Sequence, residues 1–454
     1  MRTYELKKAP GVPLYEALYR CIRGDILSGS LTPNQKLPSK RTLCANLKVS
    51  KITVETAYNQ LLEEGYIRSV EKVGYFVEEL PQRPHAPTSA PGATPPPTRS
   101  KDLIDLTANG PVHFPFSVWS KLQREVMLDL GEQLLLPLHN QGLPELRQAI
   151  ADHLEGFRGM RIDPENILIG AGTDFLYNLL IQLLGREKTY AVEEPGYGKI
   201  RKIYAAAGAE CISAPMDEMG VLPALDGQVL HISPAHHFPT GLITPLSRRQ
   251  ELLTWAQQGD RYIIEDDYDS EFRFSAHPMP TMQSLDGSGR VIYMNTFSKT
   301  LAPSIRVSYM VLPQALREKF QQTLGFYSCT VPSFQQYTLA RFIRRGHLEK
   351  HINRMRKRYK VCRNRVLTAL ENSPYREQLT VLEEDAGLHF LLQVDAPLSD
   401  EELVAWCERA GFQVQALREF YHSTPPESAK GKLVINYSGL TDEDLTQLEQ
   451  KLAK

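Results

Sequence analysis

Seven prolines fall between residues 81 and 97, and this segment constrains the fold of the chain more than any other. The residues between the prolines are mostly small, so the segment has little apolar surface to bury and favours extended polyproline conformations. We therefore expect a semi-rigid linker over 81–100. It divides the chain into an N-terminal head of residues 1–80 and a body of residues 101–454.

The composition is that of a globular protein. Of the 454 residues, 42% are apolar and 23% are charged, and the formal net charge is −1. Six cysteines are scattered without a CxxC pair, which predicts reduced thiols and no metal site. No apolar run approaches the roughly 20 residues that span a bilayer, and the N-terminus lacks an apolar signal region. We expect a cytoplasmic protein that binds neither a metal nor a membrane.

The head contains three helical patterns followed by two short strands. Apolar residues recur at helical spacing over 14–27, and Gly29 ends that pattern. Ser39 and Ser50 can cap a second and a third helix, because a serine hydroxyl accepts a backbone N–H at a helix start. The third pattern ends at Gly65, and two β-type runs follow it. This order predicts a winged helix-turn-helix.

Positive charge is concentrated where such a domain contacts DNA. Residues 36–51 contain five lysines and arginines and no acid. They span the starts of the second and third helices, which face the duplex backbone and the major groove in a helix-turn-helix. On charge alone, the alternative is a small helical domain with a solvated basic face.

Four motifs resemble the GntR-type winged helix over residues 12–80. They read Leu-Pro-Ser-Lys-Arg-Thr-Leu at 37–43, Val-Ser-Lys-Ile-Thr-Val at 49–54, Ala-Tyr-Asn-Gln-Leu at 57–61 and Glu-Gly-Tyr-Ile at 64–67. The resemblance implies that Arg41 and Lys51 contact phosphate or base. It also implies that Thr53 and Tyr58 support the recognition helix.

The wing completes the surface that we assign to double-stranded DNA. Arg68 and Lys72 flank it, and it reads Val-Glu-Lys-Val-Gly at 70–74, without the glycine-rich run usual in the family. The expected DNA-binding residues are Ser39, Lys40, Arg41, Ser50, Lys51, Thr53, Tyr58, Arg68, Lys72 and Gly74.

The body alternates short apolar runs with helical patterns. The runs are 167–169, 228–232, 262–265 and 291–294, with helical patterns at 174–184 and 246–257. Such alternation predicts a mainly parallel sheet covered by helices, and hence a multidomain α/β chain. Long helical patterns over 336–370 and a smaller α+β region follow.

Lys299 lies between two hydroxyls, seven residues before Arg306. An amine that attacks a carbonyl must lose its proton, and a nearby cation favours that loss. Hydroxyls and an arginine also suit a phosphate group. A lysine that forms a Schiff base beside a phosphate site is what pyridoxal phosphate requires, which makes Lys299 the candidate catalytic residue. The alternative for a single lysine is a solvated surface charge.

Other residues of the body could complete a site for this cofactor. Asp266 follows a strand and could keep the pyridine nitrogen protonated, while Tyr268 could reach the ring oxygen. Tyr197 could stack on the ring. Taken singly, such residues also occur in solvated turns and in ordinary packing. The predicted phosphate cup comprises Ala171, Gly172 and Thr173 at a helix start, with Thr296, Ser298 and Arg306.

In their chain order, these motifs resemble the fold type I aminotransferases over residues 103–454. Further matching segments are 142–147, 239–241 and 386–390. A GntR-type head joined by a long linker to such a body resembles the MocR-type transcription regulators. That resemblance implies a pyridoxal 5′-phosphate cofactor on Lys299. It also implies a homodimer with sites near the subunit boundary, and heads exchanged between subunits in a head-to-tail arrangement.

The body departs from the aminotransferase pattern at three places. Val434 stands where enzymes of α-amino acids have an arginine that clamps the carboxylate. Phe238 replaces an asparagine that faces the ring oxygen, and His236 and His237 are either its substitutes or ordinary loop histidines. A tyrosine that reaches the partner's phosphate is absent from 134–139. The cations that could hold a carboxylate instead are Lys199, Arg201 and Arg418.

The groups that anchor the cofactor therefore remain, while the standard carboxylate clamp does not. We hypothesise a DNA-binding transcription regulator that senses pyridoxal phosphate or a small amino compound. Closure of the body would shift two heads whose spacing must match two half-sites. The alternative is an active aminotransferase with an appended DNA-binding head. A third hypothesis is a dimer scaffold without cofactor.

Overall fold

In a computed structural model, the chain divides into two compact units, Met1–Arg99 and Ser100–Lys454. The structure describes residues 4, 13–79, 103–107, 113–223, 225–274, 279–383 and 387–453. The predicted linker at 81–100 lies outside these residues, as does Ala386. Among the described residues, no helix is long and apolar enough to cross a membrane, and no cluster of three or more His, Cys, Asp or Glu side chains could hold a metal.

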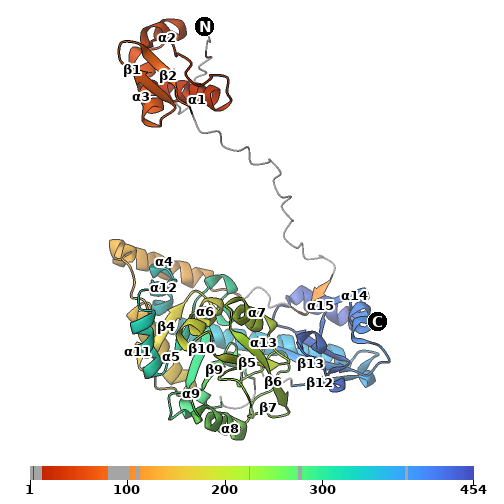
Figure 1. Ribbon diagram of the computed structural model, residues 1–454. Helices are drawn as coiled ribbons and strands as arrows, with labels where there is room; N and C mark the ends of the chain where they lie inside the picture. The colour runs from red at the N-terminus through yellow and green to blue at the C-terminus, as the bar shows by residue number, and fades with distance from the viewer. Residues whose placement is uncertain are drawn as a thin grey trace. The chain divides into compact units, whose positions relative to one another are not determined.

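The head unit is a small three-helix domain with a β-hairpin (Figure 1). Its elements are α1 (Leu14–Leu27), α2 (Lys40–Leu47), α3 (Lys51–Glu63), β1 (Ile67–Val70) and β2 (Gly74–Val77). Gly29 and Gly65 follow α1 and α3 with φ of +73° and +74°, which ends both helices where the sequence predicts. The predicted winged helix-turn-helix is therefore confirmed.

Serine caps start the second and third helices. The Ser39 hydroxyl accepts the N–H of Thr42 at 3.1 Å, and the Ser50 hydroxyl accepts the N–H of Thr53 at 3.2 Å. The sequence predicts both serines at the DNA, and their hydroxyls are engaged within the head.

Tyr58 ties the third helix to the segment that enters the second. Its side chain is fully buried, and its hydroxyl donates to the carbonyl oxygen of Pro38 at 2.9 Å. Its ring packs edge-on against Tyr75 of the hairpin, with centroids 5.0 Å apart. The sequence groups Tyr58 with the DNA-binding residues, but burial keeps it from direct contact with DNA, so it supports the recognition helix α3 from inside.

The body is built on an eight-stranded sheet with the order β4-β11-β10-β9-β8-β5-β6-β7. Strands β10, β9, β8, β5 and β6 run parallel, while β11 is antiparallel to both of its neighbours and β7 to β6. The mainly parallel sheet is confirmed, although the sequence did not single out β5, β6 or β11. The strands are β4 (Ile167–Gly170), β5 (Thr189–Glu194), β6 (Glu210–Asp217), β7 (Gly220–Val221), β8 (Val229–Ile232), β9 (Tyr262–Asp266), β10 (Val291–Thr296) and β11 (Ser308–Val311).

Helices such as α6, α7 and α8 lie beside this sheet in Figure 1. The helices of this part of the body are α4 (Phe116–Leu130), α5 (Pro144–Arg158), α6 (Thr173–Leu184), α7 (Gly198–Ala206), α8 (Leu246–Gln257), α9 (Met282–Leu285), α10 (Phe297–Thr300), α11 (Gln314–Thr323), α12 (Ser333–Arg344) and α13 (His347–Glu371). The long pattern predicted over 336–370 is two helices, because Gly346 adopts φ +70° between α12 and α13.

A second, antiparallel sheet forms a small C-terminal lobe, drawn in blue at one end of the body in Figure 1. Its strand order is β12-β13-β16-β15. The elements of this lobe are β12 (Leu379–Leu382), β13 (His389–Val394), β15 (Gln415–Ala416), β16 (Lys432–Asn436), α14 (Asp400–Arg409) and α15 (Asp442–Leu452). Separately, β3 (Ile104–Asp105) pairs in parallel with β14 (Phe412–Gln413).

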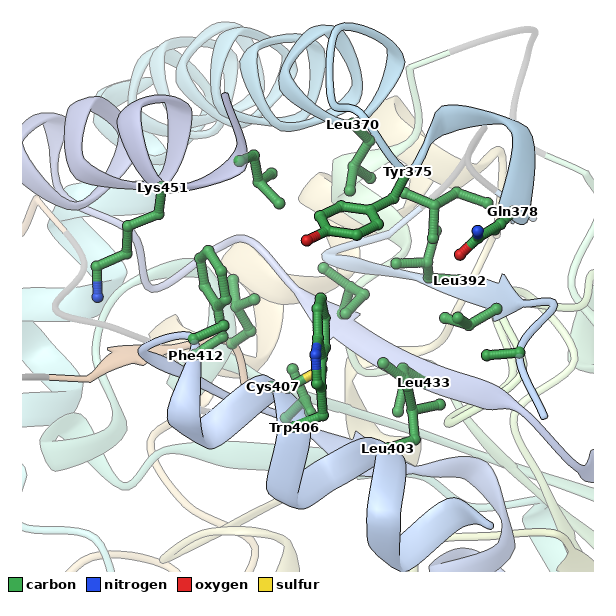
Figure 2. Close-up of a pocket in the computed structure, with 18 of the residues that line it drawn as sticks. Leu370, Tyr375, Gln378, Leu392, Leu403, Trp406, Cys407, Phe412, Leu433 and Lys451 are labelled. Atoms are coloured by element: carbon green, nitrogen blue, oxygen red, sulfur yellow. The ribbon is translucent and has the colours of Figure 1, made fainter. Parts of the chain in front are cut away.

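The two faces of this small sheet differ. Strand alternation sends Leu433 and Ile435 of β16 into the main core of the lobe. On that side lies an apolar cavity of about 650 Å³, lined by elements that include α14 and α15 (Figure 2). Tyr375 and Trp406 both line this cavity, and their ring centroids lie 5.4 Å apart. Val434 points to the opposite face, where it joins a separate apolar cluster.

We predict that Tyr58→Phe loosens the head. The change leaves the Pro38 carbonyl without its donor, which should cost about 1 kcal/mol of stability. Amide hydrogen exchange of α2 and α3 in the full chain should accelerate accordingly. Tyr66→Phe is the control, because the Tyr66 hydroxyl meets Arg23 at an exposed position. Equal exchange in both variants would contradict the role of the Tyr58 bond.

Candidate functional site

Lys299 lies in α10, the short helix that directly follows β10. Thr296 caps this helix, and its hydroxyl accepts the Ser298 N–H at 3.1 Å. Burial lowers the pKa of the Lys299 ammonium, while the charges of Asp269 and Asp266 oppose that shift. The lysine therefore gives up its proton more readily than a surface lysine, as a nucleophilic amine must.

Asp266 ends β9 and pairs in register with Met294 of the neighbouring β10, which leads to Lys299. Its side chain is buried, and Oδ2 accepts a hydrogen bond from the Tyr177 hydroxyl. Oδ1 is also buried and has no hydrogen-bond partner among the described residues. An unpaired buried carboxylate oxygen is costly, so a protonated ring nitrogen fits this position.

Three residues that sequence analysis missed orient Asp266. Tyr177 comes from α6, His231 from β8 and Tyr204 from α7. His231 Nε2 lies 3.4 Å from Asp266 Oδ2, and its Nδ1 lies 2.6 Å from the Tyr204 hydroxyl. Burial raises the pKa of both tyrosines well above the usual value, so each keeps its proton and can donate it. No local motif announces them, since they come from separate elements.

Tyr268 contacts a histidine, and that histidine contacts a buried acid. Its hydroxyl lies 3.3 Å from His236 Nδ1, which also lies 2.9 Å from Asp269 Oδ2. The Tyr268 ring centroid is 6.0 Å from Lys299 Nζ. A Cβ at Gly387 would clash with the His236 ring, so the glycine makes room for this histidine. Of the two loop histidines that sequence analysis considered, His236 is the one beside Tyr268.

Two parts of the predicted phosphate cup, Arg306 and the residues that start α6, lie side by side. Gly172 precedes α6 with φ +90°, and a Cβ there would clash with the Arg306 guanidinium. Arg306 itself donates to the carbonyl oxygen of Ala171 at 3.3 Å and lies 3.5 Å from Asp174. Thr173 is the first residue of α6, whose leading N–H groups point away from the helix. Cationic and N–H donors thus converge on a position that suits an anion.

The remaining predicted cofactor residues differ in their surroundings. Thr296 is buried, and its hydroxyl accepts from Ser308 at 2.8 Å. Ser298 is half-buried beside Lys299. Tyr197 is 51% exposed and meets Phe238 edge-on, with centroids 6.1 Å apart.

The head presents a cationic surface at the starts of α2 and α3. Arg41 and Lys51 are exposed, and Ile52 beside them is 75% exposed. Lys40 is less free, because it pairs with Glu55 at 2.9 Å.

The wing supplies the other predicted DNA contacts. Lys72 is exposed at the turn with φ +60°. Arg68 is engaged with Asn34 at 2.6 Å and with Glu78 at 3.3 Å. A Cβ at Gly74 would approach the Lys36 side chain at 3.2 Å, so the backbone there is closely covered.

Comparison with protein families matches both parts of the chain. Residues 14–77 match the bacterial regulatory proteins of the gntR family. Residues 101–452 match aminotransferase class I and II, a family whose members typically bind pyridoxal phosphate. Among solved structures, an archaeal alanine:glyoxylate aminotransferase has a TM-score of 0.68 and 25% identity over 77% of this chain and 90% of its own.

Several regulators match nearly end to end. YdeL, an uncharacterized HTH-type transcriptional regulator of Bacillus subtilis, is 36% identical over 98% of this chain and 97% of its own. MocR of Rhizobium meliloti, a probable rhizopine catabolism regulatory protein, is 32% identical over 97% and 93%. PdxR of Corynebacterium glutamicum, a pyridoxine biosynthesis regulator, is 31% identical over 93% and 91%. Because this chain combines a gntR-family head with a class I and II aminotransferase body and matches these regulators nearly end to end, it belongs to the MocR-type family of transcription regulators.

Proposed function

We propose that the body of this regulator binds pyridoxal phosphate through Lys299 and that occupancy of this site changes the affinity of the head for DNA. The observation that carries the proposal is the buried, unpartnered Oδ1 of Asp266, on the strand next to the one that leads to the lysine. Asp266 would pair with the ring nitrogen, and Tyr268 would donate to the ring oxygen. Arg306 and the start of α6 would hold the phosphate. When bound, the cofactor supplies an electrophilic carbon and an electron sink.

We also propose that the regulator acts as a homodimer. Large apolar side chains are exposed along α4, along the 3₁₀ turn Gly131–Leu135 that follows it and at residue 326. Exposed apolar area of this kind favours association with a second copy. These residues are Phe116, Met127, Leu128, Leu135, Leu136 and Phe326. Head-to-tail exchange of the heads stays a prediction from the family resemblance.

The central prediction concerns Lys299. Pyridoxal phosphate at fixed salt should shift the affinity of the full-length protein for DNA upstream of its own gene, and Lys299→Ala should abolish that shift. Borohydride reduction followed by mass spectrometry should locate the cofactor on Lys299 in the native chain. Lys202→Ala, an exposed lysine of α7, is the matched control and should behave as the native protein. DNA binding indifferent to the cofactor would refute the sensing role.

A turnover assay of the native protein and the Lys299→Ala variant separates a regulator from an enzyme. Pure protein that repeatedly converts an amino acid and a keto acid, with the rate lost in Lys299→Ala, would favour the active aminotransferase. Occupancy without turnover would favour the sensor.

Asp266→Asn should weaken retention of pyridoxal phosphate. An amide oxygen cannot form the charged pair with a protonated ring nitrogen, and a hydrogen bond to a charged group contributes about 1.5–3 kcal/mol, or roughly 10- to 100-fold in affinity. Equilibrium dialysis measures the change. Asp152→Asn, at an exposed position of α5, is the control. Equal retention in both variants would contradict the assigned role of Asp266.

Arg41→Ala and Lys51→Ala should weaken binding to all DNA sequences if the two side chains meet phosphates. Each lost phosphate contact should reduce the slope of log affinity against log salt by about 0.9. Arg20→Ala, an exposed position of α1, should leave the slope unchanged. A change in sequence preference without a change in slope would assign the residue to a base instead.

A further inference from the structure

The position of the missing carboxylate clamp is filled by apolar side chains. Val434 is only 4% exposed and packs with Leu391, its partner across the β13–β16 pair. Leu417 and Ala429 complete this cluster, and Phe238 packs against it. We call this set the Val434 cluster. It leaves no charge where an amino acid carboxylate would be held.

The Val434 cluster is connected to the Lys299 site by aromatic contacts. Across β13 and β16, His389 pairs with Asn436 and Leu391 pairs with Val434. Residues two apart on a strand share a face of the sheet, so His389 projects from the same face as Val434. The Phe238 ring lies 5.1 Å from the His389 ring, which lies 4.6 Å from His236. His236 in turn meets Tyr268 beside the lysine.

His237 and His389 do not replace the missing charge. Burial is the main cause that lowers the pKa of His389 well below the usual value and that of His237 to about 3. Both are therefore neutral at physiological pH and cannot balance a carboxylate. The Nε2 atoms of His236, His237 and His389 are buried and have no hydrogen-bond partner among the described residues. They offer hydrogen bonds to an uncharged polar group.

The cations that sequence analysis considered as substitutes are engaged elsewhere. Lys199 pairs with Asp174 at 2.7 Å, and Arg418 lies 3.5 Å from Asp400. Arg201 donates to the Cys211 carbonyl at 2.9 Å and to the Ser213 hydroxyl at 2.7 Å. None of these three cations is therefore free to pair with a carboxylate in this region, and a carboxylate buried without an ionic partner is strongly unfavourable.

We propose that the effector beside Lys299 is a primary amine with an apolar or aromatic body and no carboxylate. The body of the effector lies against Phe238, the partly exposed ring at the edge of the Val434 cluster, and the amine lies towards Lys299. This inference rests on the proposed function and names the class of effector for the same site.

Matched pairs of small molecules test this class directly. Phenethylamine and phenylalanine differ by one carboxylate, as do butylamine and norvaline. The full-length protein, loaded with pyridoxal phosphate, is titrated with each compound while its melting temperature and its affinity for DNA are followed. Each amine should act at a concentration at least about ten-fold below that of its amino acid, because only the amino acid buries an unpaired charge.

Substitution of Val434 provides the reverse test. Val434→Arg should introduce the missing cation and shift the preference towards phenylalanine and norvaline. Val434→Met, of comparable length but uncharged, should keep the preference for amines. The native comparison does not depend on whether Val434→Arg folds.

Two outcomes overturn the inference. An amino acid that acts as well as its amine in the native protein would show that a carboxylate is held after all. Failure of every amine, in protein whose DNA affinity responds to pyridoxal phosphate, would overturn the effector class and leave the proposed function standing. If no cofactor attaches to Lys299, the proposed function itself fails.

Discussion

Five acidic side chains are buried between residues 265 and 271, and the body is organised around their compensation. Asp267 lies 2.6 Å from the buried guanidinium of Arg158 and accepts from the Tyr293 hydroxyl at 2.7 Å. Glu265 accepts two backbone N–H groups at the start of α9. Burial raises the pKa of Glu271 to about 7, so part of its population is neutral. Because an uncompensated buried charge is very costly, Arg158 and Tyr293 must stay beside Asp267, and the start of α9 must stay beside Glu265.

Three oxygens of this acidic segment are buried without a hydrogen-bond partner among the described residues, namely Asp266 Oδ1, Asp267 Oδ1 and Glu271 Oε2. Of the three residues, Asp266 is the one that lies on β9, beside the strand that leads to Lys299. Glu193 lies nearby, but burial raises the pKa of its carboxyl to about 8, with a further contribution from the charge of Asp266. Glu193 therefore stays protonated at neutral pH and adds no second charge to the site. The Asp266 carboxylate, whose Oδ2 is held by Tyr177, is a preorganised partner for one ring nitrogen.

The parts of the fold that could be predicted from sequence are those with local signals. Serine caps, glycines that end helices and apolar periodicity predict the fold of the head. In the body, Gly172, Asp266 and Lys299 lie at or just after the ends of strands that are recognisable as buried apolar runs. Tyr177 and His231 could not be predicted, because they meet Asp266 only through the strand order of the large sheet. The ion pair between Lys40 and Glu55 could not be predicted either, because a pattern of charges along the sequence does not show which cations are already paired.

The Val434 cluster bears on the choice between sensing and catalysis. An aminotransferase must hold its substrate by several groups at once, since only interactions that strengthen in the transition state accelerate the reaction. A sensor needs only a ligand that binds one state of the protein better than another. A site that keeps the groups suited to a cofactor and has apolar packing in place of the orienting arginine fits the requirement of the proposed sensing role better than that of catalysis. The apolar packing around Val434 thus supports both the proposed class of effector and the proposal of regulation over turnover.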